Sequence, residues 1–357
     1  MIKKTSSLQL PLIILFVCPF LLTNCNNSTT TTTDISNIKV SLKTYRFDKD
    51  FAAIDTNHIG EGLQKLYSKY PDFLNYYIDT FLACGINKNY SDTSRNIIDS
   101  LKPYLTLKDF VNLEDTIKKY YADTKDIDGK LTDGFRYMKH YFPNYFVPKI
   151  LYLNMYLASN WPAFPLDSAI LCVGLDWFLG DQFPFYASVG KPPYMIAHRR
   201  KSYLPVAVFN VVYYDKHPFR KDDQTLLGLM LQRGKEQYFL HKILPRTADS
   251  VLFGFPGHKI DWCAENEGLI YNFFVHQGLL YNKEPSAILP YVNDGPFAAN
   301  IPDANPAYNT PGNIGAWLGY RIVSAYMAQN PTITLQQLLD QPTDPAQFLD
   351  AAKYRPK

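Results

Sequence analysis

The sequence has few of the residue patterns that mark enzyme active sites. No two of its seven histidines lie three or four residues apart. Zinc peptidases place two histidines at that spacing on one helix face, as in HExxH, so no helical zinc site is indicated. The chain also contains no GxSxG nucleophile motif and no GxxxxGK phosphate loop. The common hydrolase and nucleotide-binding signatures are therefore missing.

Cysteine is scarce, and the charges nearly balance. Five cysteines occur in 357 residues, and Cys84, Cys172 and Cys263 lie in apolar segments without CxxC spacing. We therefore expect buried free thiols and no disulfide framework. The formal net charge is only +3, which argues against a basic face for nucleic acid. A hydrophobic content of 46%, with 15% aromatics, is ample for a sizeable core.

The N-terminus carries the pattern of an export signal. Two lysines within the first four residues precede an apolar stretch over 10–22, which is too short for a permanent membrane helix. The stretch ends in LLTNC, which resembles a bacterial lipobox. We therefore expect residues 1–24 to be a signal peptide and Cys25 to be lipidated. Asn24 departs from the usual Gly, Ala or Ser, so an ordinary cleaved signal with an incidental cysteine is the alternative.

The tract after Cys25 predicts a tether. Residues 26–34 are almost entirely Asn, Ser and Thr, so they cannot bury enough apolar surface to offset the entropy lost on ordering. We expect a flexible Thr-rich tether over 25–40 and a single globular domain over 41–357. No acidic cluster follows Cys25, which favours a domain that faces the periplasm, on either the inner or the outer membrane.

Helical periodicity dominates the rest of the chain. Apolar residues recur at helical spacing over 61–82, and Pro71 should divide that segment into two helices. Further helices are predicted over 91–101, 106–123, 131–143, 192–214, 223–244, 257–281, 313–329, 334–340 and 344–354.

Two segments are instead typical of β-strands. Residues 149–158 and 168–180 are rich in β-formers and are separated by a loop with two prolines. We expect an antiparallel hairpin or part of a small sheet, preceded by an extended segment at 45–55. Residues 284–312 predict a long loop with six prolines, which we take as the first candidate for a contact surface. The fold class is α+β, with one predominantly helical domain.

The helix predicted around 226–245 has a Gly-Lys pair at its centre. Gly in a helix interior costs about 1 kcal/mol relative to Ala, so Gly234 should permit close approach by a neighbouring helix. We expect its apolar residues to pack inward, namely Leu227, Leu231, Tyr238 and Leu244.

A few polar side chains could carry chemistry. Asp261 and Glu265 lie four residues apart on one helix face and could form an acid/base pair, although acids near a helix N-terminus also complement its dipole. A divergent hydrolase would have to use scattered groups, namely Glu236, His241, Glu267 and Tyr320. A ligand-binding module with a cleft of aromatic side chains is a third possibility, ranked behind a non-catalytic contact protein and a divergent hydrolase.

Several strings, taken in order, resemble the gliding motility lipoprotein family GldB of the Bacteroidetes. They run from about residue 45 to about 350 and comprise YRFDKDFAAID, LYSKYPDFLNYYID, GLDWFLGDQFPFY, GKEQYFLHKILPRTADS, WCAENEGLIYNFFVHQGLLY and TPGNIGAWLGYRIVSAYM. The resemblance implies an envelope lipoprotein needed for gliding and linked to the type IX secretion machinery. It implies no assigned catalytic activity.

A more distant similarity is to predicted gluzincin-like zinc proteases. Residues 201–214 would occupy the position of the HExxH helix, but they lack both histidines and the glutamate. Gln232 or Arg233 would replace the ligand glutamate of the second helix. This similarity implies a degenerate peptidase frame without its metal.

The sequence therefore predicts a non-catalytic, lipid-anchored envelope protein. It would act through protein–protein contacts in gliding motility or type IX secretion, without cofactor, metal or nucleic acid. A divergent periplasmic metal-dependent hydrolase is the alternative.

Overall fold

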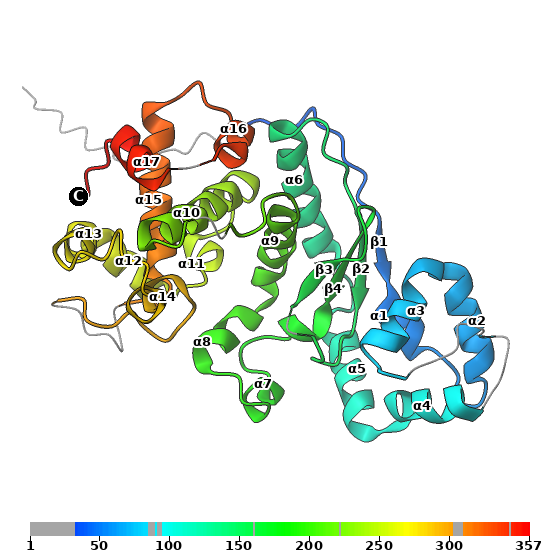
Figure 1. Ribbon diagram of the computed structural model, residues 1–357. Helices are drawn as coiled ribbons and strands as arrows, with labels where there is room; N and C mark the ends of the chain where they lie inside the picture. The colour runs from blue at the N-terminus through cyan, green and yellow to red at the C-terminus, as the bar shows by residue number, and fades with distance from the viewer. Residues whose placement is uncertain are drawn as a thin grey trace, which may run out of the picture. The chain divides into compact units, whose positions relative to one another are not determined.

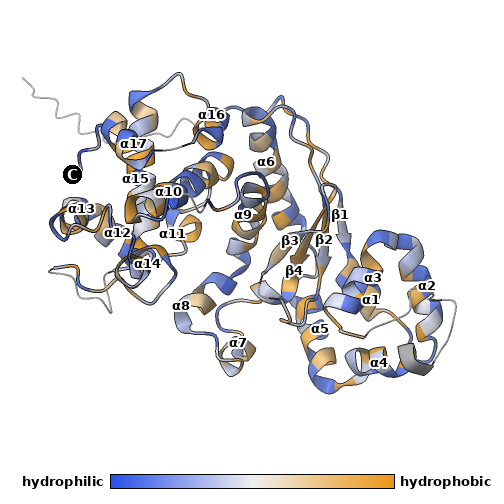
Figure 2. Ribbon diagram, in the orientation of Figure 1, coloured by the Kyte–Doolittle hydropathy of each residue, from blue (hydrophilic) through white to orange (hydrophobic). Residues whose placement is uncertain are grey.

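Four short strands form one mixed sheet in the first half of the chain (Figure 1). The order is β1-β2-β4-β3, with β1, β2 and β4 parallel and β3 antiparallel to β4. The strands are β1 Thr44–Arg46, β2 Lys149–Leu153, β3 Ala163–Pro165 and β4 Ile170–Gly174. Strands β2 and β4 are buried along nearly their whole length, which explains their continuous apolar sequences (Figure 2).

The computed structural model describes residues 33–84, 90, 95–159, 161–220, 223–302, 310–342 and 344–357. The predicted signal peptide, Cys25 and the first half of the predicted tether lie outside these residues. Ile35–Lys357 form one compact unit around a continuous hydrophobic core. None of the helices within the described ranges is long and apolar enough to cross a bilayer.

The antiparallel hairpin predicted for 149–158 and 168–180 is wrong, although both segments do belong to a small sheet. β2 and β4 pair in parallel, because the chain between them forms β3 and reverses direction there. The hairpin is made by β3 and β4 instead. Pro165 lies in β3 at the sheet edge, where a missing backbone N–H is tolerated.

Six helices lie between β1 and β2 in the sequence. They are α1 Phe47–Ala52, α2 Ile59–Lys69, α3 Pro71–Thr80, α4 Arg95–Thr106, α5 Lys108–Tyr120 and α6 Lys125–Tyr141. The predicted division at Pro71 is confirmed. Proline lacks the N–H for an interior helix bond, restricts the residue before it and fits the first helical position. The extended segment expected over 45–55 is mostly wrong, since only β1 is extended and α1 follows at once.

The second half of the chain is helical, as predicted. After the 3₁₀ turn η1 Leu175–Phe178 come α7 Pro184–Ser188, α8 Pro193–Ile196, η2 Ala197–Arg199, η3 Lys201–Tyr203, α9 Leu204–Lys216, α10 Leu226–Ile243, α11 Asp249–Leu252, α12 Gly257–Glu265, α13 Glu267–His276, α14 Pro285–Val292, α15 Ile314–Gln329, α16 Leu335–Asp340 and α17 Pro345–Ala352. The prediction of one helix over 192–214 was too long, since α8, η2, η3 and α9 divide it. The predicted loop 284–312 begins with α14.

Helices α10 and α15 meet at two glycines, which we call the glycine crossing. A Cβ on Gly234 would lie 2.3 Å from the carbonyl carbon of Gly319, and one on Gly319 would lie 1.9 Å from the Met230 carbonyl oxygen. The predicted close approach at Gly234 is therefore confirmed. The neighbouring apolar residues also behave largely as predicted, with Leu227, Leu231 and Leu244 buried and Tyr238 half-buried.

Candidate functional site at the carboxyl edge of the sheet

Polar side chains follow three neighbouring strands at the points where these strands end. Arg46 ends β1 and Asp48 comes two residues later, Asn154 follows β2, and Asp176 lies two residues after β4. The three strands are parallel, so their carboxyl ends lie at one edge of the sheet. Ligands of parallel sheets bind at such edges. We call this region the carboxyl edge.

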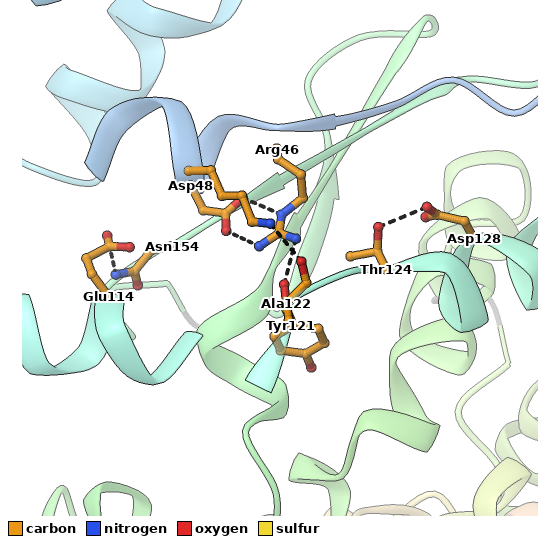
Figure 3. Close-up of polar contacts among 9 residues, drawn as sticks. Arg46, Asp48, Glu114, Tyr121, Ala122, Thr124, Asp128 and Asn154 are labelled. Atoms are coloured by element: carbon orange, nitrogen blue, oxygen red, sulfur yellow. Dashed lines mark hydrogen bonds and ion pairs between the residues drawn. The ribbon is translucent and has the colours of Figure 1, made fainter. Parts of the chain in front are cut away.

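Asp48 is a buried carboxylate, and Arg46 pairs with both of its oxygens. The Arg46 guanidinium donates from Nε to Asp48 Oδ1 at 2.8 Å and from NH2 to Oδ2 at 2.6 Å (Figure 3). Its NH1 donates to the Tyr121 carbonyl oxygen at 2.8 Å, and Lys49 Nζ donates to that of Ala122 at 2.9 Å. These bonds fasten β1 and α1 to the end of α5. Asp48 therefore has a structural role in the site.

Asp128 accepts hydrogen bonds that anchor α6 to the sheet. Its Oδ2 accepts from Thr124 Oγ1 at 2.9 Å, as Figure 3 shows, and its Oδ1 accepts from the Tyr152 hydroxyl at 2.7 Å. Because Tyr152 is in β2, this carboxylate ties the helix to the sheet.

The turn after β2 has an uncommon backbone conformation. Tyr156 and Leu157 have φ values of 52° and 54°, a left-handed conformation that costs a non-glycine residue about 1 kcal/mol or more. Asp176 holds this turn, because its Oδ1 accepts the Met155 N–H at 3.0 Å and its Oδ2 accepts the Leu157 N–H at 2.7 Å. Burial raises the pKa of Asp176 to about 6, against the lowering effect of these hydrogen bonds.

The turn directs two donors at Glu114 on α5. Asn154 Nδ2 and the Tyr156 hydroxyl both donate to Glu114 Oε1, at 2.8 and 3.0 Å (Figure 3 shows the first bond). No residue in the described part of the chain donates a hydrogen bond to Oε2. Burial raises the pKa of Glu114 to about 7, and the charges of Asp48 and Asp176 act in the same direction. This carboxyl group therefore changes its protonation near neutral pH.

Glu114 lines a cavity of about 240 Å³, which we call the Glu114 pocket. Its walls combine carboxylates with apolar and aromatic side chains, and two lysines also line it. The lining includes Asp48, Lys49, Phe51, Tyr104, Glu114, Asp115, Lys118 and Tyr156. The Tyr104 and Tyr156 rings lie 5.2 Å apart between centroids and both pack against Phe110. Such a pocket can accept a hydrogen-bond donor or a small cation, or hold a proton.

The sequence did not single out these residues. Glu114 is one acid in an amphipathic helix, which is typical of a solvated face, and Asp176 lies within a string used only to recognise the family. A usable signal was the polar residue directly after each buried strand, Asn154 after β2 and Asp176 soon after β4. This signal could not identify a site before the strands were known to be parallel, because only parallel strands place these polar residues at one edge of the sheet.

The structure pairs Glu236 with its own neighbours. Tyr214 donates to Glu236 Oε2 at 2.5 Å and Arg233 at 3.2 Å, and Arg233 also donates to the Tyr214 hydroxyl at 2.7 Å. The cluster joins α9 to α10. Gln232 exchanges hydrogen bonds with the backbone of Arg220 at 2.8 and 3.3 Å. Both Gln232 and Arg233 are therefore engaged in hydrogen bonds with neighbouring residues.

Glu267 is engaged elsewhere. Its side chain is buried and accepts from Arg321 Nε at 3.0 Å, from Arg321 NH2 at 3.1 Å and from the Tyr354 hydroxyl at 2.6 Å. These bonds join α13, α15 and the segment after α17. The predicted acid/base pair of Asp261 and Glu265 lies on α12 with both residues exposed.

His241 and Tyr320 are the two predicted hydrolase residues that do come together. Their rings stack with centroids 4.2 Å apart. His241 Nδ1 lies 2.7 Å from the Gln237 carbonyl oxygen, and its Nε2 lies 3.4 Å from Asp249 Oδ1. Within the described ranges, no three His, Cys, Asp or Glu side chains gather as metal ligands.

Lys235 lines a cavity of about 400 Å³ between α9, α10 and α16. Its ammonium donates to the Gln341 carbonyl oxygen at the end of α16, at 3.3 Å. Burial, with the like charge of Arg220, lowers the pKa of Lys235 to about 8. Capping a helix C-terminus is a structural role for this lysine.

Two further predictions concern the thiols and the Pro-rich loop. Cys172 and Cys263 are free and buried, as expected, and Cys84 is free and half-buried. Lys259 on α12 holds the loop, because its Nζ donates to the carbonyl oxygens of Pro296 and Thr310 at 2.9 and 2.8 Å. Residues 303–309 lie outside the described residues.

The sequence profile of the family described as gliding motility protein GldB matches residues 28–356. This chain belongs to the GldB family. The match confirms the resemblance stated from the sequence strings, and it supports a membrane-anchored envelope protein with a role in gliding motility. Neither the curated proteins nor the solved structures that were searched contain a match. The similarity to zinc proteases stays a prediction.

Proposed function

We propose that this GldB-family protein is a non-catalytic component of the cell envelope. Lipid on Cys25 would anchor it, the folded domain would face the periplasm, and it would act by contact with other proteins of the gliding or type IX secretion machinery. Family membership supports the gliding role. The lipid anchor rests on the lipobox-like LLTNC sequence and the Thr-rich tract that follows it.

The observation that carries the non-catalytic proposal is the separate use of the two predicted hydrolase carboxylates. Glu236 is bound by Tyr214 and Arg233 between α9 and α10, whereas Glu267 is bound by Arg321 and Tyr354 beside α13. A buried carboxylate in such a pair stabilises the packing around it, and breaking the pair leaves an uncompensated charge. Neither group is thereby poised as a base or a metal ligand.

Metal analysis tests this proposal directly. Purified protein should contain far less than one zinc per chain after exposure to zinc and desalting. Zinc at about one per chain, lost in His241→Ala or Glu267→Gln, would overturn the proposal in favour of the metal-dependent hydrolase. Because Glu267→Gln can also disturb folding, circular dichroism of each variant accompanies the measurement.

Contact with envelope proteins is tested by crosslinking and pulldown from membranes. We expect the wild-type chain to capture components of the gliding or secretion machinery. Replacing residues 303–309 by a Gly/Ser segment of equal length should reduce this capture if the Pro-rich loop is the contact surface. Unchanged capture would refute the loop as that surface.

The anchor has its own test. A clickable palmitate analogue should label the wild-type chain and leave Cys25→Ser unlabelled. Equal labelling of both chains would remove Cys25 as the lipidation site, without bearing on the metal measurement.

The pKa of Glu114 favours a second candidate function. A carboxyl group that titrates near neutral pH beside a pocket is typical of acid/base catalysts. A divergent hydrolase could use Glu114 in place of the residues named from sequence. Hydrolysis of peptide or ester substrates that is abolished in Glu114→Gln and kept in Glu61→Gln, which lies outside the pocket, would establish this function.

A further inference from the structure

The Glu114 pocket combines three independent features of a binding site. It lies at the carboxyl edge of a parallel sheet, it is bordered by a turn with two left-handed residues, and it contains a carboxylate with one oxygen engaged. Backbone strain of this kind is found at functional sites when surrounding contacts maintain it. Asp176 supplies those contacts, so the turn is held with Asn154 and Tyr156 directed at Glu114 Oε1.

The two Glu114 oxygens differ in a way that points to a ligand. Oε1 accepts two hydrogen bonds, from Asn154 and Tyr156, whereas no described residue donates to Oε2. A carboxylate can accept up to about four hydrogen bonds. The missing donors on Oε2 can therefore come from a molecule in the pocket.

The charges around Glu114 select a cation. The charged groups that act most strongly on it are Asp48 and Asp176, both negative, and Asp48 is paired with Arg46. Tyr104 and Tyr156 line the pocket with aromatic rings, which attract cations through their π faces. Two lysines also line the pocket: the Lys49 ammonium is bonded to the Ala122 carbonyl oxygen, and Lys118 is exposed to solvent.

The size of the pocket restricts the ligand further. At about 30 Å³ per water, its 240 Å³ would hold roughly eight waters. That is room for a short aminoalkyl chain, and it is smaller than the cavities of about 300 Å³ or more that take drug-sized ligands. The apolar side chain of Phe51 in the lining suits methylene groups.

We propose that the Glu114 pocket binds a primary ammonium group on an alkyl chain, with the ammonium donating to Glu114 Oε2 and the chain packed against Tyr104 and Tyr156. The same chemistry is found in a free alkyl diamine and in a lysine side chain of another protein. This inference goes beyond the proposed function and does not depend on it.

Titration of the purified full-length chain tests the inference, with binding followed by NMR chemical shifts or calorimetry. The probes are cadaverine, N-acetyl-lysine methylamide and, as an uncharged match, N-acetyl-norleucine methylamide. Both amines should bind saturably in the millimolar range and the norleucine probe should not. Stronger binding of cadaverine would assign the site to free amines, and stronger binding of the lysine probe would assign it to a protein side chain.

Two variants separate recognition by charge from general packing. Glu114→Gln keeps the shape of the side chain and should lose at least tenfold in amine affinity. Glu61→Gln, exposed on α2 and outside the pocket lining, should change affinity less than threefold. Equal binding by Glu114→Gln, equal binding of the norleucine probe, or no saturable binding by wild type would each overturn the inference.

The pH dependence gives a further readout. Because Glu114 titrates near pH 7, affinity should rise about tenfold between about pH 6 and about pH 8 as the carboxylate forms. The other titratable groups around the pocket are Asp48, Lys49, Tyr77, Tyr104, Asp115, Lys118, Tyr156 and Asp176. Any contribution from them would remain in Glu114→Gln, so the difference between the two profiles isolates Glu114. Parallel profiles would overturn the inference.

Discussion

The glycine crossing and the carboxyl edge are both buried, but they are held together by different forces. At the glycine crossing, two backbones touch without intervening side chains, so shape alone determines the fit. At the carboxyl edge, Glu114 and Asp176 are held by hydrogen bonds whose strength depends on protonation. The first region should therefore be sensitive to volume and indifferent to pH, and the second should show the reverse.

The largest effect is expected from adding one carbon at the glycine crossing. In Gly319→Ala, the new Cβ would lie 1.9 Å from the Met230 carbonyl oxygen, so the helices must separate. We expect a loss of about 3 kcal/mol or more in the free energy of unfolding, measured by urea denaturation. Gly129→Ala is the control, because its helical site on α6 is open, and it should stabilise by up to about 1 kcal/mol. Equal effects of Gly319→Ala and Gly129→Ala on the free energy of unfolding would show that added volume is not what limits the glycine crossing.

The next effect concerns the strained turn. Asp176→Asn replaces one of the two acceptors of the Met155 and Leu157 N–H groups by a donor, within a fully buried site. We expect the free energy of unfolding to fall by about 2–3 kcal/mol at neutral pH. Asp115→Asn changes an exposed carboxylate in the same way and should stay within about 0.5 kcal/mol of wild type. A loss in the free energy of unfolding smaller than that of Asp115→Asn would show that the turn keeps its conformation without Asp176.

Stability at the carboxyl edge should depend on pH through Glu114. Its pKa is about 7 in the folded protein against an ordinary value of 4.5, so the folded state binds more protons between these values. The resulting stabilisation is present below about pH 4.5 and is lost as pH rises through about 7. The difference between the two pKa values corresponds to about 3.4 kcal/mol, which partial solvent exposure of the Glu114 side chain reduces to about 2 kcal/mol. Unfolding of Glu114→Gln, measured over this window, should lack that decline. Glu61→Gln, exposed on α2, should keep the wild-type profile.

The smallest effect tests a polar contact in the helical half of the protein. Tyr354→Phe removes the hydroxyl that donates to Glu267, but Arg321 still pairs with the carboxylate. We expect a loss of about 1 kcal/mol, and no change in Tyr281→Phe, where the ring is exposed. A loss larger than that of Asp176→Asn would show that polar contacts matter as much among the helices as at the carboxyl edge.

Local rules were sufficient to predict much of the helical structure. Pro71 divides two helices because its restrictions act on adjacent residues. Gly234 could be assigned to a close helix contact because a glycine inside a helix needs a compensating reason. In both cases the physical cause lies within a few residues of the feature.

The sheet and the candidate site could not be predicted in this way. β1 and β2 are about a hundred residues apart in the chain, and their parallel pairing follows from packing that no short segment contains. Glu114 is distinguished from the neighbouring acid Asp115 by its contacts with Asn154 and Tyr156, some forty residues away. Burial of a single carboxylate is a property of the assembled fold.

Helix α10 has one more consequence, which concerns motion. It contacts α6, α9, α11, α14, α15, α16 and α17, and its buried residues lie on every side of the helix. No partial opening can expose its backbone without displacing several neighbours at once. The amide protons of its central turns should therefore exchange with solvent only when the whole domain unfolds, so that their exchange rates report the global free energy of unfolding. The helix singled out in the sequence for its central glycine would then be the slowest-exchanging part of the protein.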